Sequence, residues 1–168
     1  MIYGAELGYS WCEERQQVRS SYGRKRFNIM GAIDSNSNET VVISNDTYIT
    51  SSEIVELFTK LREKNKGKDV YIFLDNARYQ KCKIVEEASI KYNIKIIYLP
   101  TYSPNLNLIE RLWKFLRKHC LCNKYFMTFV EFAESLLNCL NKTHIEYSKE
   151  LDKTLAHNFE ALGFSKQI

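Results

Sequence analysis

The sequence contains no apolar run close to the roughly 20 residues that a helix needs to cross a bilayer. Its first residues include neither a basic segment nor a long apolar segment, so we expect no secretion signal. It also has no internal repeats, no low-complexity segment and no evident linker. A length of 168 residues is enough for one proper core and too short for two full ones. These features predict one cytoplasmic domain that does not span a membrane.

The cysteines are an odd, scattered set of five, namely Cys12, Cys82, Cys120, Cys122 and Cys139. Without a secretion signal, we expect all of them to be reduced thiols. Two of them lie close to His119, but a closed zinc site needs four ligands, and the sequence has no second pair at a suitable spacing. We therefore expect no zinc site.

The net charge is +4, from 24 lysines and arginines against 20 aspartates and glutamates. This excess is mild, and it is compatible with nucleic-acid binding without being diagnostic of it. The cations are clustered, however, and five of them are candidates for contacts with phosphates: Arg24, Arg26, Lys114, Arg117 and Lys118. A second interpretation stays open, because such clusters are also typical of solvated faces.

The first half of the chain predicts two strands and a helix. Residues 27–33 and 40–44 are rich in apolar and β-branched residues and flank a run of turn formers, which is typical of an antiparallel hairpin. Apolar residues at helical spacing follow Glu53, and Ser51 or Ser52 can cap this helix. Weaker strand candidates are residues 7–11 and 16–20.

The second half alternates between strand and helix patterns. The continuous apolar run at residues 70–74 predicts a strand that is covered on both faces. A helix over residues 81–92 leads to a strand at 94–99, and Ser103-Pro104 predicts the start of the next helix. Further helices are expected over residues 126–140 and 149–162. This order predicts an α/β fold, with a mixed sheet flanked by helices on both faces.

Two acidic residues stand where a shared metal site can form. Asp75 directly follows the strand at residues 70–74, and the carboxyl ends of strands are where open sheets place their sites. Glu110 lies about one and a half turns into the helix that starts near Ser103. Because Mg²⁺ prefers carboxylate and water oxygens, Asp75 and Glu110 are candidate ligands of a divalent cation.

An ordered set of motifs surrounds these two acids, and 34 residues lie between them. The motifs run from Leu74 to Ala77, from Leu99 to Asn107 and from Ile109 to Trp113, with further matches over 23–28 and 45–49. In these residues and in the spacing of the acids, the chain resembles the DDE transposases of mariner-type bacterial insertion sequences. The resemblance covers most of the chain.

The resemblance implies a ribonuclease-H-like fold in which Asp75 and Glu110 bind Mg²⁺ or Mn²⁺ and carry catalysis. It implies metal-dependent DNA strand cleavage and strand transfer, acting on transposon ends and target DNA in the bacterial cytosol or nucleoid. A homodimer or a complex with full-length transposase is the expected protein assembly.

One departure from the family pattern concerns the third carboxylate, an aspartate on the first and central strand. By register this aspartate would precede Met1, and neither Glu6 nor Asp34 nor Asp46 takes its place. We therefore expect residues 1–168 to form a single partial catalytic domain that lacks its first central strand and the upstream helix-turn-helix region. Gln80 is a smaller departure, because relatives often carry histidine near this position.

The departure leaves open whether the chain is an enzyme, since only two of the three acids are present. The leading hypothesis is a truncated transposase that is inactive alone. The alternatives are a regulatory fragment that binds DNA or full-length transposase without catalysis, and a ribonuclease-H-like nuclease.

Overall fold

The computed structural model describes residues 25–100 and 106–155, together with positions 3, 13, 14, 17 and 19. In chain order its elements are β1 (Asn28–Ile33), β2 (Thr40–Asn45), α1 (Ser51–Lys64), β3 (Val70–Leu74), α2 (Lys83–Lys91), β4 (Ile94–Tyr98), α3 (Leu108–Leu116), the π-helical segment η2 (Arg117–Leu121), α4 (Phe129–Asn141) and α5 (Ser148–Thr154). Every helix within the described ranges is too short or too polar to cross a membrane. The strand candidates at 7–11 and 16–20 lie outside these ranges.

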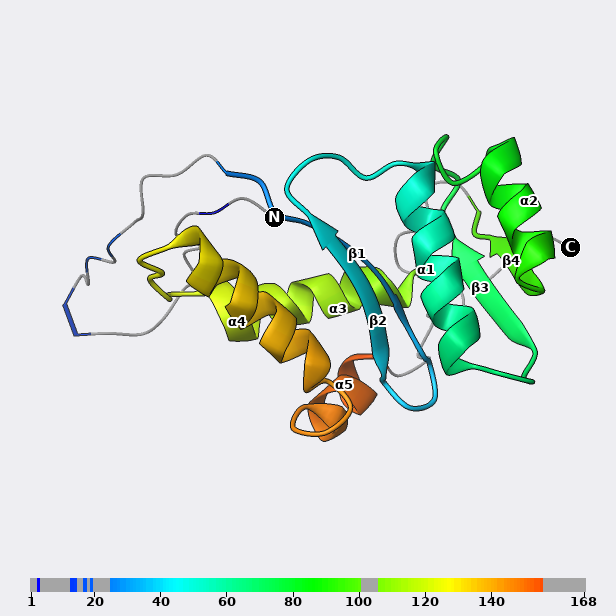
Figure 1. Ribbon diagram of the computed structural model, residues 1–168. Coiled ribbons are helices and arrows are strands. Elements are labelled where there is room, and N and C mark those ends of the chain that lie inside the picture. Colours follow the sequence, from blue (N-terminus) through cyan, green and yellow to red (C-terminus); the bar gives the residue numbers. More distant parts are fainter. Residues whose placement is uncertain are drawn as a thin grey trace, which may run out of the picture.

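The strands form two separate pairs (Figure 1). β1 and β2 form the predicted antiparallel hairpin, in a register that sets Ile33 opposite Thr40. β3 and β4 are parallel, with Val70 opposite Ile94, and α2 makes the crossover that a parallel pair needs. Among the described residues no strand joins the two pairs, so the expected mixed sheet is open between β1 and β3.

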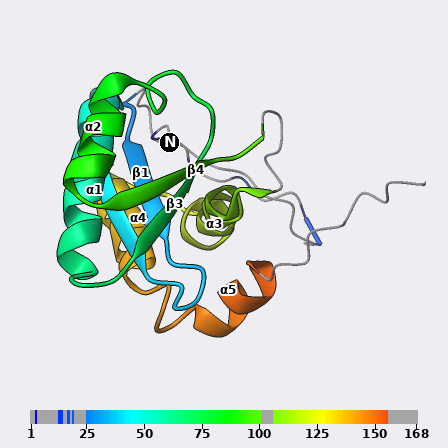
Figure 2. The same ribbon diagram turned by 90° about the vertical axis from the view of Figure 1, so that its right-hand side faces the viewer.

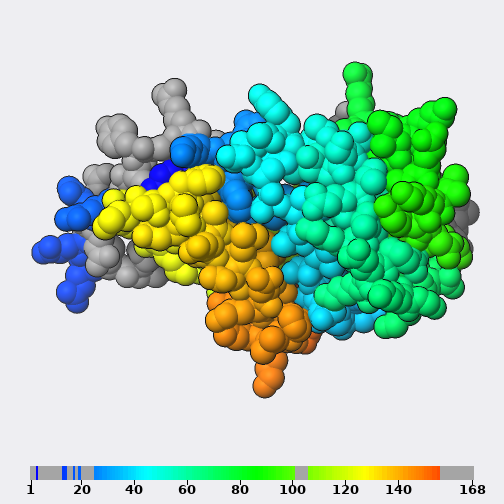
Figure 3. All heavy atoms as spheres, viewed as in Figure 1, coloured from blue at the N-terminus to red at the C-terminus, as the bar shows by residue number. Residues whose placement is uncertain are grey.

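Two hydrophobic cores lie on opposite sides of the hairpin, and Figure 2 shows α1 and α2 on one side and α3 on the other. The first core joins α1 to one face of both strand pairs through Ile43, Ile54, Leu57, Phe58, Ile72, Val85 and Ile94. The second core joins α3, η2, α4 and α5 through Leu112, Phe115, Leu116, Leu121, Phe132, Leu136, Leu140 and Leu151. Side chains of α1, in teal, and α2, in green, form one continuous surface over the first core (Figure 3). β1 is therefore covered on both of its faces.

The start of α1 differs slightly from the prediction. Its cap is Thr50, whose Oγ1 accepts a hydrogen bond from the Ser52 backbone N–H at 3.2 Å. The Glu53 carboxylate in turn accepts from the Thr50 backbone N–H at 2.6 Å, which completes a capping box. The predicted caps Ser51 and Ser52 are wrong, because both already belong to the first turn of the helix.

The prediction that the strand at residues 70–74 is covered on both faces is wrong. Side chains alternate along a strand, and only the face that carries Ile72 contacts the first core. Tyr71 and Phe73 point the other way and are 53% and 58% exposed. Helical spacing in α2 predicts that Ile84, Val85 and Ala88 face inward; Val85 and Ala88 are buried, whereas Ile84 is 56% exposed and does not face inward.

Two cysteines form a disulfide, contrary to the expectation of reduced thiols. Cys120 in η2 is joined to Cys139 in α4, with their Cα atoms 6.7 Å apart. Both residues are buried in the second core. Cys82 and Cys122 are free thiols. The disulfide therefore links η2, which continues from the helix of Glu110, to α4 in the same core.

We predict that Thr50→Ala lowers the free energy of unfolding by about 1 kcal/mol, the usual effect of losing an N-cap side chain. Hydrogen bonds from the Thr50 side chain and backbone lower the pKa of Glu53 below its ordinary value of 4.5. This part of the stability is present above pH 4.5 and is lost as the pH falls through the lower pKa of the folded state. Urea unfolding measures the free energy of unfolding of wild type and of Thr50→Ala. The difference between the two proteins should become smaller as the pH is lowered from neutral to acid.

The matched control for Thr50→Ala is Ser52→Ala, because Ser52 is exposed and only its backbone takes part in the cap. Equal loss of stability in both variants would contradict the capping box as the start of α1.

Candidate active site

Asp75 is held at the carboxyl end of the parallel pair, where the sequence predicts it. The pairing of β3 with β4 continues to the residue before it, since the Leu99 backbone N–H donates to the Leu74 carbonyl oxygen at 2.8 Å. The Asn76 side-chain amide donates to the Leu99 carbonyl oxygen at 2.7 Å and ties the ends of the two strands together. The exposed Asp75 carboxylate thus extends from a backbone that is fixed on either side.

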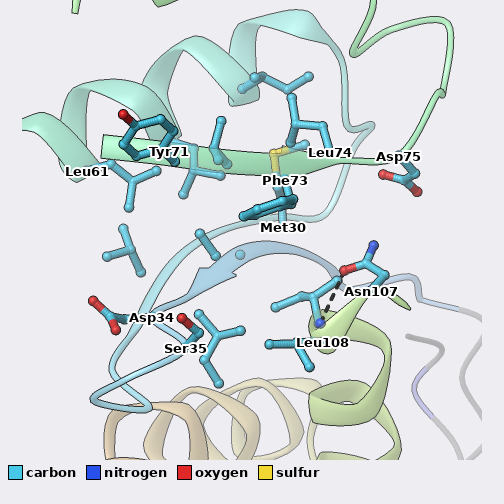
Figure 4. Close-up of a pocket in the computed structure, with 18 of the residues that line it drawn as sticks. Met30, Asp34, Ser35, Leu61, Tyr71, Phe73, Leu74, Asp75, Asn107 and Leu108 are labelled. Atoms are coloured by element: carbon cyan, nitrogen blue, oxygen red, sulfur yellow. Dashed lines mark hydrogen bonds between the residues drawn. The ribbon is translucent and has the colours of Figure 1, made fainter. Parts of the chain in front are cut away.

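Glu110 lies in the first turn of α3. Asn107 caps this helix, and its Oδ1 accepts from the Ile109 backbone N–H at 3.2 Å, the dashed line in Figure 4. The Glu110 backbone N–H donates to the Asn107 carbonyl oxygen at 3.2 Å. Ser103 and Pro104, the predicted start, lie outside the described residues. The prediction that Glu110 lies one and a half turns into its helix is wrong, because that helix begins at Leu108.

The two carboxylates line one cavity of about 810 Å³ between β1, β3, α1 and α3. Figure 4 shows β1 and β3 running past it in opposite directions, with Asp75 and Asn107 at one end and Asp34 at the other. Asp75 comes from the first core's strand pair and Glu110 from the second core's helix. The structure therefore brings the two predicted site residues to the same cavity.

The two acids fit a hard divalent cation as ligands. Mg²⁺ is commonly held by one or two carboxylates while it keeps several waters, and both side chains are exposed to the cavity and to solvent. Among the residues that the structure describes, no group of three or more histidines, cysteines, aspartates or glutamates is arranged to hold a metal. Asp34, Glu39 and Asp69 line the same cavity, but none of these described residues is grouped with Asp75 and Glu110 as a third ligand.

Gln80 is a residue of this cavity to which sequence reasoning gave no role. It is 7% exposed, and its side-chain Oε1 has no hydrogen-bond partner in the described part of the chain. The Tyr98 hydroxyl donates to the Gln80 backbone carbonyl at 3.3 Å, and burial raises the pKa of this phenol, so that it remains a donor. A buried acceptor without a donor is costly, so Gln80 marks a place where a donor is needed.

Three of the predicted DNA-binding cations continue from Glu110 along one side of its helix. Lys114, Arg117 and Lys118 follow it at four, seven and eight positions, and all three are exposed. Within the described residues none of them forms an ion pair. Arg26 is exposed just before β1, whereas Arg24 lies outside the described residues.

The sequence profile described as DDE superfamily endonuclease matches residues 5–133. A curated relative, the uncharacterized protein y4pE/y4sA of Sinorhizobium fredii (strain NBRC 101917 / NGR234), is 27% identical over 81 residues, which are 48% of this chain and 58% of that protein. The chain thus spans little more than half the length of this relative.

Solved structures of the Mos1 transposase resemble the fold. The Mos1 mariner paired-end complex with Mn has a TM-score of 0.61 at 14% identity, covering 92% of this chain and 51% of that one. The Mos1 strand transfer complex has a TM-score of 0.60 at 14% identity, covering 93% and 51%. The chain therefore has the ribonuclease-H-like fold of these catalytic domains, and by the profile match over most of its length it belongs to the DDE superfamily endonucleases.

Proposed function

We propose that the chain is the catalytic domain, or part of it, of an insertion-sequence transposase that cleaves and joins DNA strands with Mg²⁺ or Mn²⁺. The observation that carries this proposal is that Asp75 and Glu110 line one cavity in a member of the DDE family. A Mos1 structure solved with Mn supports the choice of metal. The proposed place of action is the bacterial cytosol or nucleoid, on transposon ends and target DNA.

In this proposal the carboxylate oxygens of Asp75 and Glu110 hold the cation. A bound divalent cation would activate the attacking oxygen and stabilise the leaving oxygen of a phosphodiester. Asn76 and Asn107 are positioning residues, because each fixes the backbone next to one carboxylate through a hydrogen bond. The acids would otherwise repel a phosphate, so a cation between them is needed before DNA can approach.

The exposed cations beyond Glu110 support a path for the DNA backbone. Lys114 lies one turn from Glu110, and Arg117 and Lys118 lie about two turns away. A strand with its reacting phosphate at the acids would thus meet positive charge along α3 and η2. We propose phosphate contacts for these three residues and also for Arg24 and Arg26.

A second candidate function is regulation without catalysis, and one observation favours it. Asp34, Glu39 and Asp69 also line the cavity, but among the described residues no third carboxylate is grouped with Asp75 and Glu110 to hold a metal. A chain of this kind that binds DNA or a full-length transposase, and cleaves nothing, would inhibit transposition in proportion to its amount. A third possibility, a ribonuclease-H-like nuclease, would cleave DNA without strand transfer, so a strand-transfer assay distinguishes it.

We predict that Asp75→Asn and Glu110→Gln each weaken Mn²⁺ binding by at least about tenfold, or 1.4 kcal/mol, since each removes one of two charged ligands. Electron paramagnetic resonance titration with Mn²⁺ measures this directly. Any Mn²⁺-dependent nicking of transposon-end DNA should fall by about a hundredfold or more in the same variants, as in other sites that lose a charge-stabilising group.

Asp69→Asn is the matched control for these two variants, because Asp69 lines the same cavity next to the first residue of β3, at the other end of that strand from Asp75. Equal Mn²⁺ affinity and nicking in wild type, Asp75→Asn and Glu110→Gln would contradict the assignment of the site. Tight DNA binding with Mn²⁺ bound and no nicking would favour the regulatory function.

We predict that replacing Arg117 and Lys118 together by glutamine flattens the salt dependence of DNA binding. For double-stranded DNA, each lost phosphate contact lowers the slope of log K against log salt by about 0.9, so the pair should lower it by roughly 1.8. Fluorescence anisotropy between low and moderate salt measures the slope. As the control, replacing Lys66 and Lys68, two exposed cations after α1, by glutamine should leave the slope unchanged. If the Arg117 and Lys118 variant also has an unchanged slope, η2 is only a solvated face.

A further inference from the structure

The face of β3 that turns away from α1 leads to the candidate active site. Side chains alternate along a strand, so Tyr71 and Phe73 share one face, and by the same alternation Asp75, just after the strand, follows them. All three line the cavity, and Figure 4 shows them in this order along β3. A ligand that lies on this face therefore reaches the Asp75 carboxylate.

The two aromatic side chains of this face are exposed. Tyr71 and Phe73 are both more than half exposed, whereas Ile72, on the opposite face of the same strand, is buried. Aromatic rings on an open sheet face are a common platform for single-stranded nucleic acid, whose unpaired bases stack on them. The face thus offers flat ring surfaces next to a candidate phosphodiester-cleaving site.

A lysine adds positive charge beside the rings. Lys95 of β4 is the register partner of Tyr71, and its Nζ donates a hydrogen bond to the Tyr71 hydroxyl at 2.9 Å and lies 4.8 Å from the ring centroid. The contact with Tyr71, and less strongly Asp69, raises the pKa of Lys95, so this ammonium stays charged. An ammonium has three N–H donors, so Lys95 keeps donors for a phosphate.

The family and the position of the face together indicate its occupant. The chain belongs to a superfamily of endonucleases, and a nucleic-acid strand whose reacting phosphate reaches Asp75 passes the residues next to it. At about 3.3 Å per residue, Phe73 and Tyr71 lie about 6.6 Å and 13 Å from Asp75, which is about two and four nucleotides at 3.4 Å each. Bases inside a duplex are stacked on one another and cannot lie on these rings, so the strand here has unpaired bases.

We propose that Tyr71 and Phe73 stack unpaired bases of the DNA strand that enters the Asp75 site, and that Lys95 contacts a phosphate of the same strand. The substrate class is thus DNA with a single-stranded segment within about four nucleotides of the reacting phosphate, rather than uninterrupted duplex. The inference rests on the proposed function, because it takes the reacting DNA to lie at Asp75. Stacking itself needs no metal and can be measured apart from cleavage.

The test compares a fluorescently labelled blunt duplex with the same duplex carrying a tail of six thymidines at its 3′ or 5′ end. Without divalent cation, at least one tail should tighten binding by about tenfold or more in fluorescence anisotropy. Phe73→Leu should remove most of this gain, since leucine is apolar but has no ring, and Phe73→Trp should retain it. Equal binding of blunt and tailed duplexes, or an unchanged gain in Phe73→Leu, would overturn the proposal.

Two control variants separate stacking from general contact. Ile97 is the cross-strand neighbour of Phe73 and is exposed but not aromatic, so Ile97→Ala should change the gain by less than about twofold. Tyr71→Leu should reduce the gain, whereas Tyr48→Leu, which removes an exposed ring between β2 and α1, should not. Equal losses in Phe73→Leu and Ile97→Ala would mean that the face is merely apolar and would overturn the stacking.

A spectroscopic measurement reports the stacking directly. The fluorescence of 2-aminopurine placed in the tail should be quenched when wild type binds and should stay high with Phe73→Leu. If wild type sediments as a dimer and Phe73→Leu as a monomer, a second copy covers the face and the proposal is overturned. Failure of the proposed metal site appears elsewhere, as equal Mn²⁺ affinity of wild type and Asp75→Asn, while the gain from the tail persists.

Discussion

The rest of the structure depends on the burial of β1 between two different cores. Met30 and Ala32 pack with the core beneath α1, whereas Ile29 and Ile33 pack with the core of α3 and α4. Gly31 sits between them, and a Cβ atom there would come within 3.0 Å of Val42 Cγ1 and 3.4 Å of Trp113. A larger residue at position 31 would thus crowd the Val42 side chain of the hairpin, while Trp113 of α3 already stands at van der Waals distance from this point of β1.

The candidate active site lies where these two cores meet. Asp75 is fixed by the β3–β4 pair, which packs with the first core, and Glu110 by the cap of α3, which packs with the second. The two acids need no hydrogen bond to each other for their placement, because a nearby asparagine, Asn76 or Asn107, fixes the backbone beside each of them. Their common cavity is thus a product of packing between layers, and changes far from either acid can alter it.

The sequence predicts those features that have a local cause. The hairpin and the crossover are confirmed because strand ends, turn formers and helix starts are encoded within a few residues, and the two acids line one cavity while their role stays a prediction. The apolar run at residues 70–74 was misleading, since periodicity within one run cannot tell whether a second layer covers it. The Cys120–Cys139 disulfide and the orphaned Gln80 oxygen had no local signal, because both depend on residues brought together by the fold.

The contacts between the hairpin and the C-terminal helices also bear on how the chain reaches this structure. Thr40 Oγ1 donates to the Leu140 carbonyl oxygen, and Thr143 Oγ1 donates to the Asn38 carbonyl oxygen, across 100 and 105 positions of sequence. The β3–α2–β4 unit closes within about thirty residues, so its contact order is low and it is expected to form early. On the ribosome, the α4-facing side of the hairpin stays uncovered until most of the chain has been made. During that interval, its exposed apolar residues are a natural target for chaperones.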